Sequence, residues 1–314
     1  MLLAAGLWAA PVAAKLCGDS VDGHDVPCAC GDVVVSSVTL TDDPVVKGGA
    51  CPHDGLVVRA PDSPRALTID LHGATLRGSG SGVGLRVVAG GPGGARVISS
   101  AGVGTIAGFL DGIVARGGDA LGQVQDITVT DSVRDGLRVA GNSFEVRRAV
   151  VRSAGRDGFA LSGRGFQIVQ SQASDCGRYG YFVMGTTAQI GLAGAGNVAE
   201  RSGELGFNVM GVGHILADCT ASLGRKAGLH LQATQLDVRG CRALDNGGDG
   251  IEGLGNYWQM SGNVALRNAG DGIRVRGVGV VDGGGNHGAD NRGEDHSRAR
   301  GAIQCAISGA PCAL

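Results

Sequence analysis

The chain has 314 residues, of which 59 are glycine, 43% are hydrophobic and 4% are aromatic. The glycines do not recur at every third position, which excludes a collagen helix, and the hydrophobic content excludes a disordered chain. With 27 basic and 29 acidic residues the formal net charge is −2, and no run of Lys or Arg supplies the basic surface that nucleic-acid binding requires. We therefore expect a folded protein whose partner is not a nucleic acid.

The first segment, residues 1–14, is apolar and ends in Val12-Ala13-Ala14. This pattern predicts a secretory signal peptide that is cleaved before Lys15. No Lys or Arg precedes the apolar stretch, which leaves open a truncated start or a retained hydrophobic arm. The stretch is shorter than the roughly 20 apolar residues that span a bilayer, so we expect no membrane span.

Cysteines gather near the two ends of the chain. Six of the nine are disulfide candidates: Cys17, Cys28, Cys30, Cys51, Cys305 and Cys312. We expect Cys305 to pair with Cys312, and two bridges among the other four, whose connectivity the sequence leaves open. A zinc site is the alternative for these four, but their spacing does not form paired Cys-x-x-Cys elements. Because disulfides persist in oxidising compartments, we expect a secreted, periplasmic or cell-surface protein.

Three short apolar runs precede the most regular part of the chain, at 33–35, 56–58 and 67–71. Their composition and spacing predict strands that belong to the first turns of a larger repeat structure. We expect residues 15–54 to form an N-terminal cap, residues 55–285 a solenoid and residues 286–314 a C-terminal cap or tail, within one domain.

From Asp111 to Gly277 the chain repeats one short phrase, for example Asp135-Gly136-Leu137-Arg138-Val139. The glycines that mark the copies are Gly112, Gly136, Gly158, Gly180, Gly206, Gly228, Gly250 and Gly272. The steps between them are 24, 22, 22, 26, 22, 22 and 22 residues. A nearly fixed period of this size is typical of a solenoid.

Each repeat has room for three short strands and for no helix. Apolar residues at the first and third positions after the marker glycine, such as Leu137 and Val139, predict a strand with one buried face. Two further apolar steps follow, as in Phe144-Glu145-Val146 and Val151. The hexapeptide steps of left-handed β-helices and the leucine-rich series are absent. The predicted fold is all-β: a single-stranded, right-handed parallel β-helix with coils of about 22 residues and disulfide-containing terminal caps.

Stacking the coils turns each repeat position into a row that runs along the solenoid. One predicted inward row contains Leu137, Phe159, Tyr181, Phe207, Leu229, Ile251 and Ile273. A second contains Ala149, Ser171, Asn197, Cys219, Cys241 and Asn263, if four extra residues within 191–196 are looped out. Polar members of this row predict side-chain ladders that satisfy backbone groups at a corner. Cys219 and Cys241 fit either buried thiols or a disulfide, and we expect Cys176 to be a free thiol.

The best candidate for chemistry is the outward row two residues after each marker glycine. Its members are Arg138, Ala160, Phe182, Asn208, His230, Glu252 and Arg274. A carboxylate between an imidazole and a guanidinium can act as an acid/base apparatus, which makes His230, Glu252 and Arg274 the catalytic candidates. Arg138, Phe182 and Asn208 are substrate-binding candidates on the same row. The alternative is a solvated face whose charges pair weakly.

A second outward row lies on the neighbouring strand of each coil. Its polar members are Glu145, Gln167, Gln189, Asp237 and Gln259. Amide and carboxylate groups suit sugar hydroxyls, so Gln189, Asp237 and Gln259 join the substrate-binding candidates. Plain solvation is again the alternative.

Other conspicuous residues favour a structural interpretation. Trp258 and His214 fall on an inward position, so we expect both to pack in the core, although Tyr257-Trp258 also suits sugar stacking. The aspartates before the marker glycines predict turn hydrogen bonds: Asp111, Asp135, Asp157, Asp249 and Asp271. A metal site in the tail is disfavoured, although its candidate ligands are His287, Asp290, Asp295 and His296. We expect no metal ion and no cofactor.

Several segments together resemble a known group. They are Cys30-Gly31-Asp32, the run Thr68-Ile69-Asp70-Leu71 followed by Gly73, and Gly262-Asn263 followed by Asp271-Gly272-Ile273. These resemble secreted bacterial proteins of the right-handed β-helix repeat group, in the wider pectin-lyase-like superfamily that includes carbohydrate-binding proteins and sugar hydrolases. The resemblance covers most of residues 30–290 and implies the fold rather than an activity, since function is carried by sites grafted onto a fold.

The motifs that enzymes of this superfamily would supply are mostly missing. The Asp-Asp pair of polygalacturonases is matched only by Asp42-Asp43 in the cap, and their Gly-His-Gly is approached only by Asn286-His287-Gly288. Neither the clustered carboxylates of pectate lyases nor the Asp-Pro-His-Asp motif of mannuronan epimerases is found. The sequence therefore predicts an exported β-helix that engages a polysaccharide or cell-surface glycan along its wall, as a non-catalytic binding or structural protein. The alternative is a lyase, hydrolase or epimerase of uronate-containing glycans.

Overall fold

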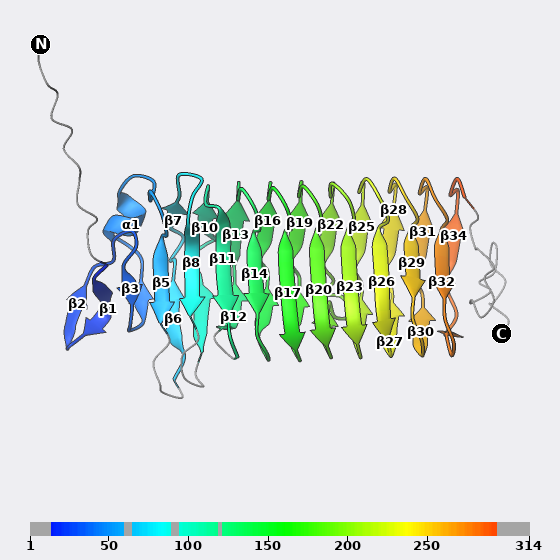
Figure 1. The fold of residues 1–314 in the computed structure, drawn as a ribbon, viewed down its shortest axis with the longest axis horizontal. Helices are drawn as coiled ribbons and strands as arrows, with labels where there is room; N and C mark the ends of the chain where they lie inside the picture. The colour runs from blue at the N-terminus through cyan, green and yellow to red at the C-terminus, as the bar shows by residue number, and fades with distance from the viewer. Residues whose placement is uncertain (1–13, 60–64, 89–93, 119–120, 294–314) are drawn as a thin grey trace, which may run out of the picture.

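The computed structural model of the chain describes residues 14–59, 65–88, 94–118 and 121–293. Within these ranges the chain forms strands almost throughout, together with a short helix, α1 (Pro44–Lys47). The strands make three sheets that run side by side along the molecule, from β1 at one end to β32 and β34 at the other (Figure 1).

The first sheet has 13 strands. They are β1 (Leu16–Val21), β2 (His24–Val26), β3 (Val33–Val34), β5 (Leu56–Arg59), β8 (Val83–Val88), β11 (Asp111–Arg116), β14 (Leu137–Ala140), β17 (Phe159–Arg164), β20 (Tyr181–Thr186), β23 (Phe207–Val212), β26 (Leu229–Thr234), β29 (Ile251–Leu254) and β32 (Ile273–Arg276). The second sheet has 11 strands. They are β4 (Val38–Thr39), β6 (Leu67–Asp70), β9 (Ala95–Ile98), β12 (Leu121–Gln125), β15 (Glu145–Arg147), β18 (Gln167–Val169), β21 (Gln189–Ile190), β24 (Ile215–Ala217), β27 (Leu236–Arg239), β30 (Trp258–Ser261) and β33 (Val281–Asp282).

The third sheet has 10 strands. They are β7 (Thr75–Arg77), β10 (Gly104–Ala107), β13 (Ile127–Thr130), β16 (Val150–Arg152), β19 (Gln172–Ser174), β22 (Val198–Glu200), β25 (Thr220–Ser222), β28 (Arg242–Leu244), β31 (Val264–Leu266) and β34 (His287–Ala289). Each coil thus contributes one strand to each sheet in turn, and the strands of successive coils pair in parallel. The predicted right-handed parallel β-helix, with three strands in each coil, is confirmed.

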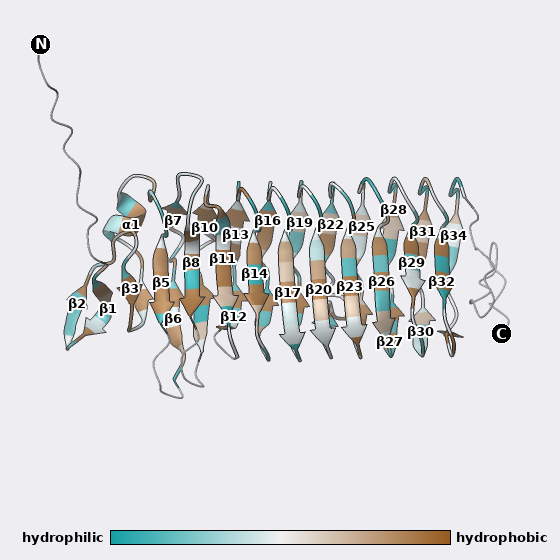
Figure 2. Ribbon diagram, viewed as in Figure 1, coloured by the Kyte–Doolittle hydropathy of each residue, from teal (hydrophilic) through white to brown (hydrophobic). Residues whose placement is uncertain are grey.

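The register of the first sheet follows the sequence period. Leu137 pairs with Phe159, Phe159 with Tyr181 and Tyr181 with Phe207, so each repeat position forms a row. Inward and outward residues alternate along strands such as β14 and β26, and Figure 2 shows this as brown and teal bands. The row predicted to point inward is buried along its whole length, at 5% exposure or less.

Aromatic side chains stack along the interior. The ring centroids of Phe159 and Tyr181 lie 4.8 Å apart, and those of Tyr181 and Phe207 lie 4.5 Å apart. Phe144 and Phe166 stack in the same way on the second sheet, at 4.6 Å. Such pairs add about 0.5–1.5 kcal/mol each to the gain from burial alone, so these rows stabilise the coils against one another.

A ladder of amide side chains runs inside one corner of the solenoid, as the second inward row predicts. The Oδ1 atom of Asn263 accepts a hydrogen bond from the Cys241 N–H at 2.9 Å, and its Nδ2 group donates to the Val238 carbonyl at 2.8 Å. The Oδ1 atom of Asn197 likewise accepts a hydrogen bond from the Ser171 N–H, at 3.0 Å. A parallel ladder, which the sequence reading did not identify, contains Asn246, Asn268 and Asn291. Both ladders satisfy backbone groups that water does not reach.

The marker glycines are required by close approach rather than by their backbone angles. A Cβ atom on Gly136 would lie 2.2 Å from Val151 Cγ1 and 2.7 Å from the Gly158 carbonyl oxygen. A different glycine, Gly163, has a φ angle of +138°, which side chains other than glycine rarely adopt. The repeat therefore uses glycine for two distinct physical reasons.

The N-terminal end carries two disulfides. Cys17 pairs with Cys28 and Cys30 with Cys51, which resolves the connectivity that the sequence left open. Cys305 and Cys312 lie outside the described residues, so their pairing stays a prediction. Cys176, Cys219 and Cys241 are buried free thiols, which excludes the alternative of a bridge between adjacent coils.

Two irregular segments also have a defined place. The extra residues near 191–196 form a loop between β21 and β22, closed by a bridge between Leu192 and Ala195, as predicted. At the C-terminal end β34 pairs with β31, so residues 287–289 continue the third sheet within the segment that we expected to be a tail. No helix in the described ranges is long and apolar enough to cross a membrane. Residues 1–13, which carry most of the predicted signal peptide, lie outside those ranges.

Candidate functional site

The predicted outward row lies on the first sheet, on the surface that we call the wall. Direct register pairs join Arg138 to Ala160, Phe182 to Asn208, Asn208 to His230, His230 to Glu252, and Glu252 to Arg274. Alternation along each strand points these side chains away from the core, because their neighbours on either side are buried. The structure therefore brings the three catalytic candidates together on adjacent coils.

Glu252 is bound by both of its neighbours on the row. Its Oε1 atom lies 2.6 Å from His230 Nδ1, and its Oε2 atom accepts a hydrogen bond from Arg274 Nη2 at 2.8 Å. The three side chains are about one quarter to one third exposed, at 27% for His230, 24% for Glu252 and 33% for Arg274. The hydrogen bond from His230 is the largest influence on Glu252, and together with Arg274 it outweighs burial and lowers the pKa of this carboxyl.

Arg274 is shared among three carboxylates. Besides Glu252, its guanidinium contacts Asp249, and its Nε atom lies 3.7 Å from Asp271 Oδ2. Burial is the largest influence on Asp249 and raises the pKa of this carboxyl, in contrast to the lowered pKa of Glu252. One coil thus holds two carboxyl groups whose environments push their pKa values apart, and Arg274 of the next coil is already ion-paired with both.

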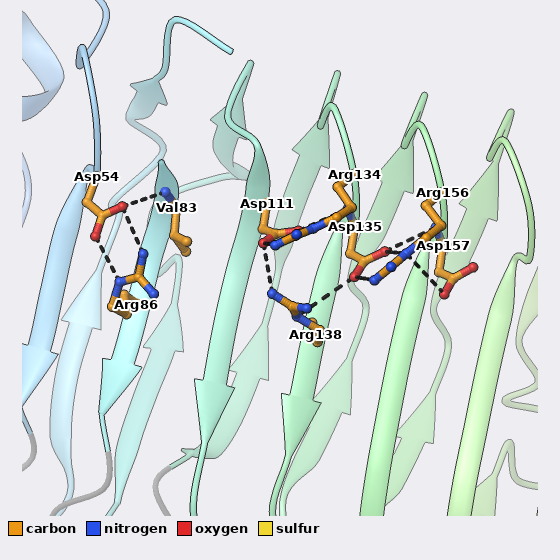
Figure 3. Close-up of polar contacts among 9 residues, drawn as sticks. All are labelled: Asp54, Val83, Arg86, Asp111, Arg134, Asp135, Arg138, Arg156 and Asp157. Atoms are coloured by element: carbon orange, nitrogen blue, oxygen red, sulfur yellow. Dashed lines mark hydrogen bonds and ion pairs between the residues drawn. The ribbon is translucent and has the colours of Figure 1, made fainter. Parts of the chain in front are cut away.

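A different pattern of aspartates and arginines occupies the same edge of the sheet in the earlier coils (Figure 3). Asp111 accepts hydrogen bonds from Arg134 Nε at 2.9 Å and from Arg138 Nη2 at 3.0 Å. Arg156 Nε donates to Asp135 at 2.7 Å. The aspartate side chains are at most 1% exposed, so these are buried carboxylates that arginines neutralise from the next coil. The same pairing recurs one coil further, where Arg178 binds Asp157.

These aspartate–arginine pairs correct the prediction of turn hydrogen bonds, and they weaken the case for Arg138 as a substrate-binding residue. The aspartates bind the arginines and backbone N–H groups of the following coil instead of making turn hydrogen bonds within their own. Arg138, predicted to bind substrate, is held by Asp111, with Asp135 at 3.8 Å, which leaves its guanidinium little capacity for a ligand. The repeated Arg-Asp-Gly at 134–136 and 156–158 is the sequence signal that would have identified these pairs.

Aromatic and amide groups lie between the two charged regions. Phe182 is half-buried, and its ring packs against Tyr179 with the centroids 6.0 Å apart. Tyr179 replaces the aspartate of the ladder in its coil, and we did not predict a role for it. Asn208 is only 7% exposed, and its Oδ1 atom has no hydrogen-bond partner among the described residues. A buried acceptor without a donor costs free energy.

Two adjoining hollows follow the wall beside this row. The first has a volume of about 500 Å³ and is lined by apolar and polar side chains that include Met184, Met210, Gln232 and Leu254. The second, of about 230 Å³, is bounded by His230, Gln232, Glu252, Leu254, Arg274 and Arg276. Both are shallow and open, which is the shape that an extended ligand lying along the sheet requires.

Arg276 is the residue of this wall that sequence reasoning missed. It lies two residues beyond Arg274, pairs in register with Leu254, and is exposed. Among the ion pairs of the described residues, none involves Arg276, whereas Arg274 takes part in three. Arg116 stands at the equivalent position seven coils earlier, where it is likewise exposed and outside every such ion pair.

The second predicted polar row lies on the second sheet, not beside the first row on the wall. Gln167 pairs with Gln189, and Asp237 with Gln259, but Ile215 separates the two pairs. Gln167 Nε2 donates to Gln189 Oε1 at 3.1 Å. Because the two rows belong to different sheets, Gln189, Asp237 and Gln259 do not share a surface with His230 and Glu252.

The residues expected in the core are found there. Trp258 is 1% exposed and its Nε1 group donates to the Ala233 carbonyl at 2.7 Å. His214 is 1% exposed, its Nδ1 atom accepts a hydrogen bond from the Ala188 N–H, and burial lowers the pKa of its imidazole. Asp295 and His296 lie outside the described residues. Within the ranges that are described, no three His, Cys, Asp or Glu side chains converge to hold a metal ion.

Comparison with known families gives a match over most of the repeat. The family model described as right handed beta helix region matches residues 111–277, which is more than half of the chain. No curated protein matches the sequence at a significant level.

Solved structures provide similarity at low sequence identity. Tailspike protein 3 of bacteriophage CBA120 is 11% identical with a TM-score of 0.51, over 96% of this chain and 58% of the tailspike chain. The A-module of mannuronan C-5 epimerase AlgE4 from Azotobacter vinelandii is 14% identical with a TM-score of 0.45, over 72% of this chain and 82% of that one. The periplasmic alginate epimerase AlgG is 16% identical with a TM-score of 0.35, over 82% and 74% of the two chains. At this identity the likeness to the tailspike concerns the fold alone.

Proposed function

The chain belongs to the right-handed β-helix family, and from this premise we propose that it is an exported, non-catalytic protein that binds an acidic polysaccharide along its wall. The disulfides Cys17–Cys28 and Cys30–Cys51 support export, because such bonds persist mainly in oxidising compartments. The proposal for the binding surface depends on the charges and hollows of the first sheet.

One observation carries the proposal: an uncompensated cation, Arg276, in the same hollow as the ion-paired row of His230, Glu252 and Arg274. Because Arg274 already contacts three carboxylates, it has little charge left for a ligand. Arg276 has its planar guanidinium available, and this group matches a carboxylate with two parallel hydrogen bonds. A sugar that carries a carboxylate, as in a uronate polymer, fits this residue.

The remainder of the wall suits the other parts of a sugar chain. Gln232 is an exposed amide on the neighbouring row, and it can bind a sugar hydroxyl. Phe182 and the exposed Met184 offer apolar surface for the C–H face of a ring, with 47% of Met184 accessible. Successive coils are spaced by roughly 4.8 Å, so a linear polymer meets equivalent positions repeatedly.

The state of Glu252 favours binding over catalysis. A general acid must hold a proton near the working pH, but His230 and Arg274 lower the pKa of this carboxyl. Both of its oxygen atoms are also engaged by those neighbours, at 2.6 Å and 2.8 Å. Glu252 therefore acts as a fixed counter-ion that orients the imidazole and the guanidinium.

A specific observation keeps an enzyme as the second candidate. The contact between Glu252 and His230 Nδ1 fixes one side of the imidazole and leaves Nε2 for a substrate, which is how a carboxylate prepares a histidine to act as a base. In that case the protein would be a lyase, hydrolase or epimerase of uronate-containing glycans, with His230 as the base.

Measuring polymer binding and product formation together distinguishes the binding protein from the enzyme. The full chain is incubated with a panel of uronate-containing polysaccharides while polymer binding and the ultraviolet absorbance of unsaturated products are both recorded, with reducing-end and epimer analysis of the same samples. We expect saturable binding without new absorbance, new reducing ends or altered sugars. Turnover that His230→Ala abolishes would replace the binding proposal with the enzyme, and absence of both binding and turnover would contradict the two.

A further inference from the structure

A separate hollow of about 590 Å³ opens on the second sheet, near the C-terminal end of the solenoid. Its lining includes Gln235, Asp237, Tyr257, Gln259 and Val281, which come from three consecutive coils. This surface belongs to a different sheet from the wall, so a ligand here does not compete for Arg276.

Tyr257 occupies a corner that is unfavourable for its residue type. Its φ angle is +60°, in the left-handed region, where a bulky side chain is a clear exception. The equivalent corner one coil earlier holds Gln235 at +57°, and the corner one coil later holds Gly279 at +68°. Glycine adopts this angle without strain, so the turn itself does not require a tyrosine at this corner.

The tyrosine is also strongly exposed for an aromatic residue. Its side chain is 64% accessible, although the neighbouring Trp258 on the same strand end is buried. The backbone of Gly279 leaves room for the ring, since a Cβ atom there would lie 2.8 Å from Tyr257 Cδ1. The ring thus lies along the corner towards the next coil, at the edge of the hollow, rather than in the core.

Polar groups without internal partners face the same hollow. Gln235 and Gln259 are exposed, and within the described residues neither side-chain amide makes a hydrogen bond. Asp237 lies two residues after Gln235 and pairs in register with Gln259, and its ion-pair partner Arg239 is at 3.5 Å. Two free amides and a carboxylate next to an exposed ring can bind several hydroxyl groups while the ring covers an apolar face.

We propose that this hollow is a second carbohydrate-binding site, specific for an uncharged hexopyranose unit. Tyr257 stacks on the C–H face of the sugar ring, and Gln235, Asp237 and Gln259 bind its hydroxyl groups. The described lining of this hollow contains no Lys or Arg, so a uronate finds no counter-ion here, and the site selects neutral sugars while the wall selects acidic ones. The inference depends on the geometry of the second sheet and does not require that the wall binds a polymer.

Tyr257→Gly provides a selective test, because glycine adopts this angle without strain and already occupies the equivalent corner of the next coil. Neutral hexasaccharides of glucose, mannose and galactose are titrated into the full chain, with binding followed by calorimetry and the melting temperature measured separately. We expect saturable binding of at least one hexasaccharide, weakened tenfold or more in Tyr257→Gly and retained in Tyr257→Phe. The melting temperature of Tyr257→Gly should equal or exceed that of the wild type, since the change relieves the strained angle.

Two results would overturn this site. One is the absence of saturable binding for all three hexasaccharides, and the other is equal affinity in the wild type and Tyr257→Gly. Arg276→Gln serves as the matched control on the wall and should leave the affinity for neutral sugars unchanged. Because the wall is tested with uronate polymers, failure of either site is distinguishable from failure of the other.

Discussion

Replacing Asn263 with alanine is expected to destabilise the protein by about 3–4 kcal/mol, since each lost hydrogen bond and each stranded buried partner costs on the order of 1 kcal/mol or more. Asn263 is completely buried in the amide ladder. Its side chain accepts from the Cys241 N–H at 2.9 Å and donates to the Val238 carbonyl at 2.8 Å and to Asn286 Oδ1 at 2.9 Å. Alanine removes all three bonds and leaves the Cys241 N–H and the Val238 carbonyl without these partners, whereas Asn286 Oδ1 keeps the bond from the residue 263 backbone N–H at 3.0 Å.

Asn142→Ala is the matched control for this change. Asn142 is exposed at another corner, where its Oδ1 atom accepts the Arg164 N–H at 3.2 Å, and water can replace the amide there. We expect that variant to lie within about 0.5–1 kcal/mol of the wild type. Chemical denaturation followed by circular dichroism measures both. Equal stabilities for the two variants would contradict the structural role of the ladder.

The second large effect is expected at Asp111. Its side chain is 1% exposed and binds Arg134 and Arg138, so Asp111→Asn leaves two arginines without their counter-ion. Breaking a buried pair by removing one partner typically costs about 3 kcal/mol. Asp245→Asn is the control, because Asp245 makes an equivalent contact to Arg267 in which both side chains are more than one third exposed. We expect that exposed pair to contribute less than about 1 kcal/mol.

The cost of Asp111→Asn should depend on pH in a defined direction. Burial favours the neutral acid at Asp111, but Arg134 and Arg138 outweigh it and lower the pKa of this carboxyl in the folded protein. The stability that the carboxylate provides is therefore complete above the unfolded pKa of about 3.9 and is lost as the pH falls through the lower folded value. Denaturation curves between pH 7 and pH 2 should show the wild type approaching the variant in acid. A difference that grows on acidification would contradict this account.

The coil and its rows could be predicted because a solenoid copies each position at a fixed sequence distance. Once the marker glycines define the period, the inward row of Leu137 and Phe159 and the outward pair of His230 and Glu252 follow directly. The amide ladder followed for the same reason, since Asn263 is the repeat equivalent of buried Cys241. Each of these statements needs the period and the alternation of a strand, and no knowledge of the three-dimensional path of the corners.

What escaped prediction depends on how the corners turn. The bend between the first and second sheets decides whether Asp237 lies beside His230, and the sequence carries no periodic signal for that bend. In the structure the two residues are on different sheets. The pairing of Asp111 with Arg134 crosses from one coil to the next between unequal repeat positions, so comparing equal positions missed it. Arg276 was overlooked because a free arginine and a paired one look alike in sequence until the counter-ions are placed.

The arrangement of charge along the wall gives the binding proposal its physical basis. In the earlier coils arginines neutralise the buried aspartates, and in the later coils Arg274 forms an ion pair with Asp249 in the same way. Arg276 is left uncompensated next to the hollow that these later coils form.

The most direct test of the wall is a calorimetric titration of a defined oligouronate into the wild type, Arg276→Gln and Arg116→Gln. Arg276 and Arg116 are equivalent exposed positions on the same sheet, so both variants lose one charge and differ only in place. A charge-assisted pair contributes about 1.5–3 kcal/mol, so we predict at least tenfold weaker binding for Arg276→Gln and wild-type affinity for Arg116→Gln. Equal affinity in all three proteins, or equal losses in both variants, would contradict a binding site at this position on the wall.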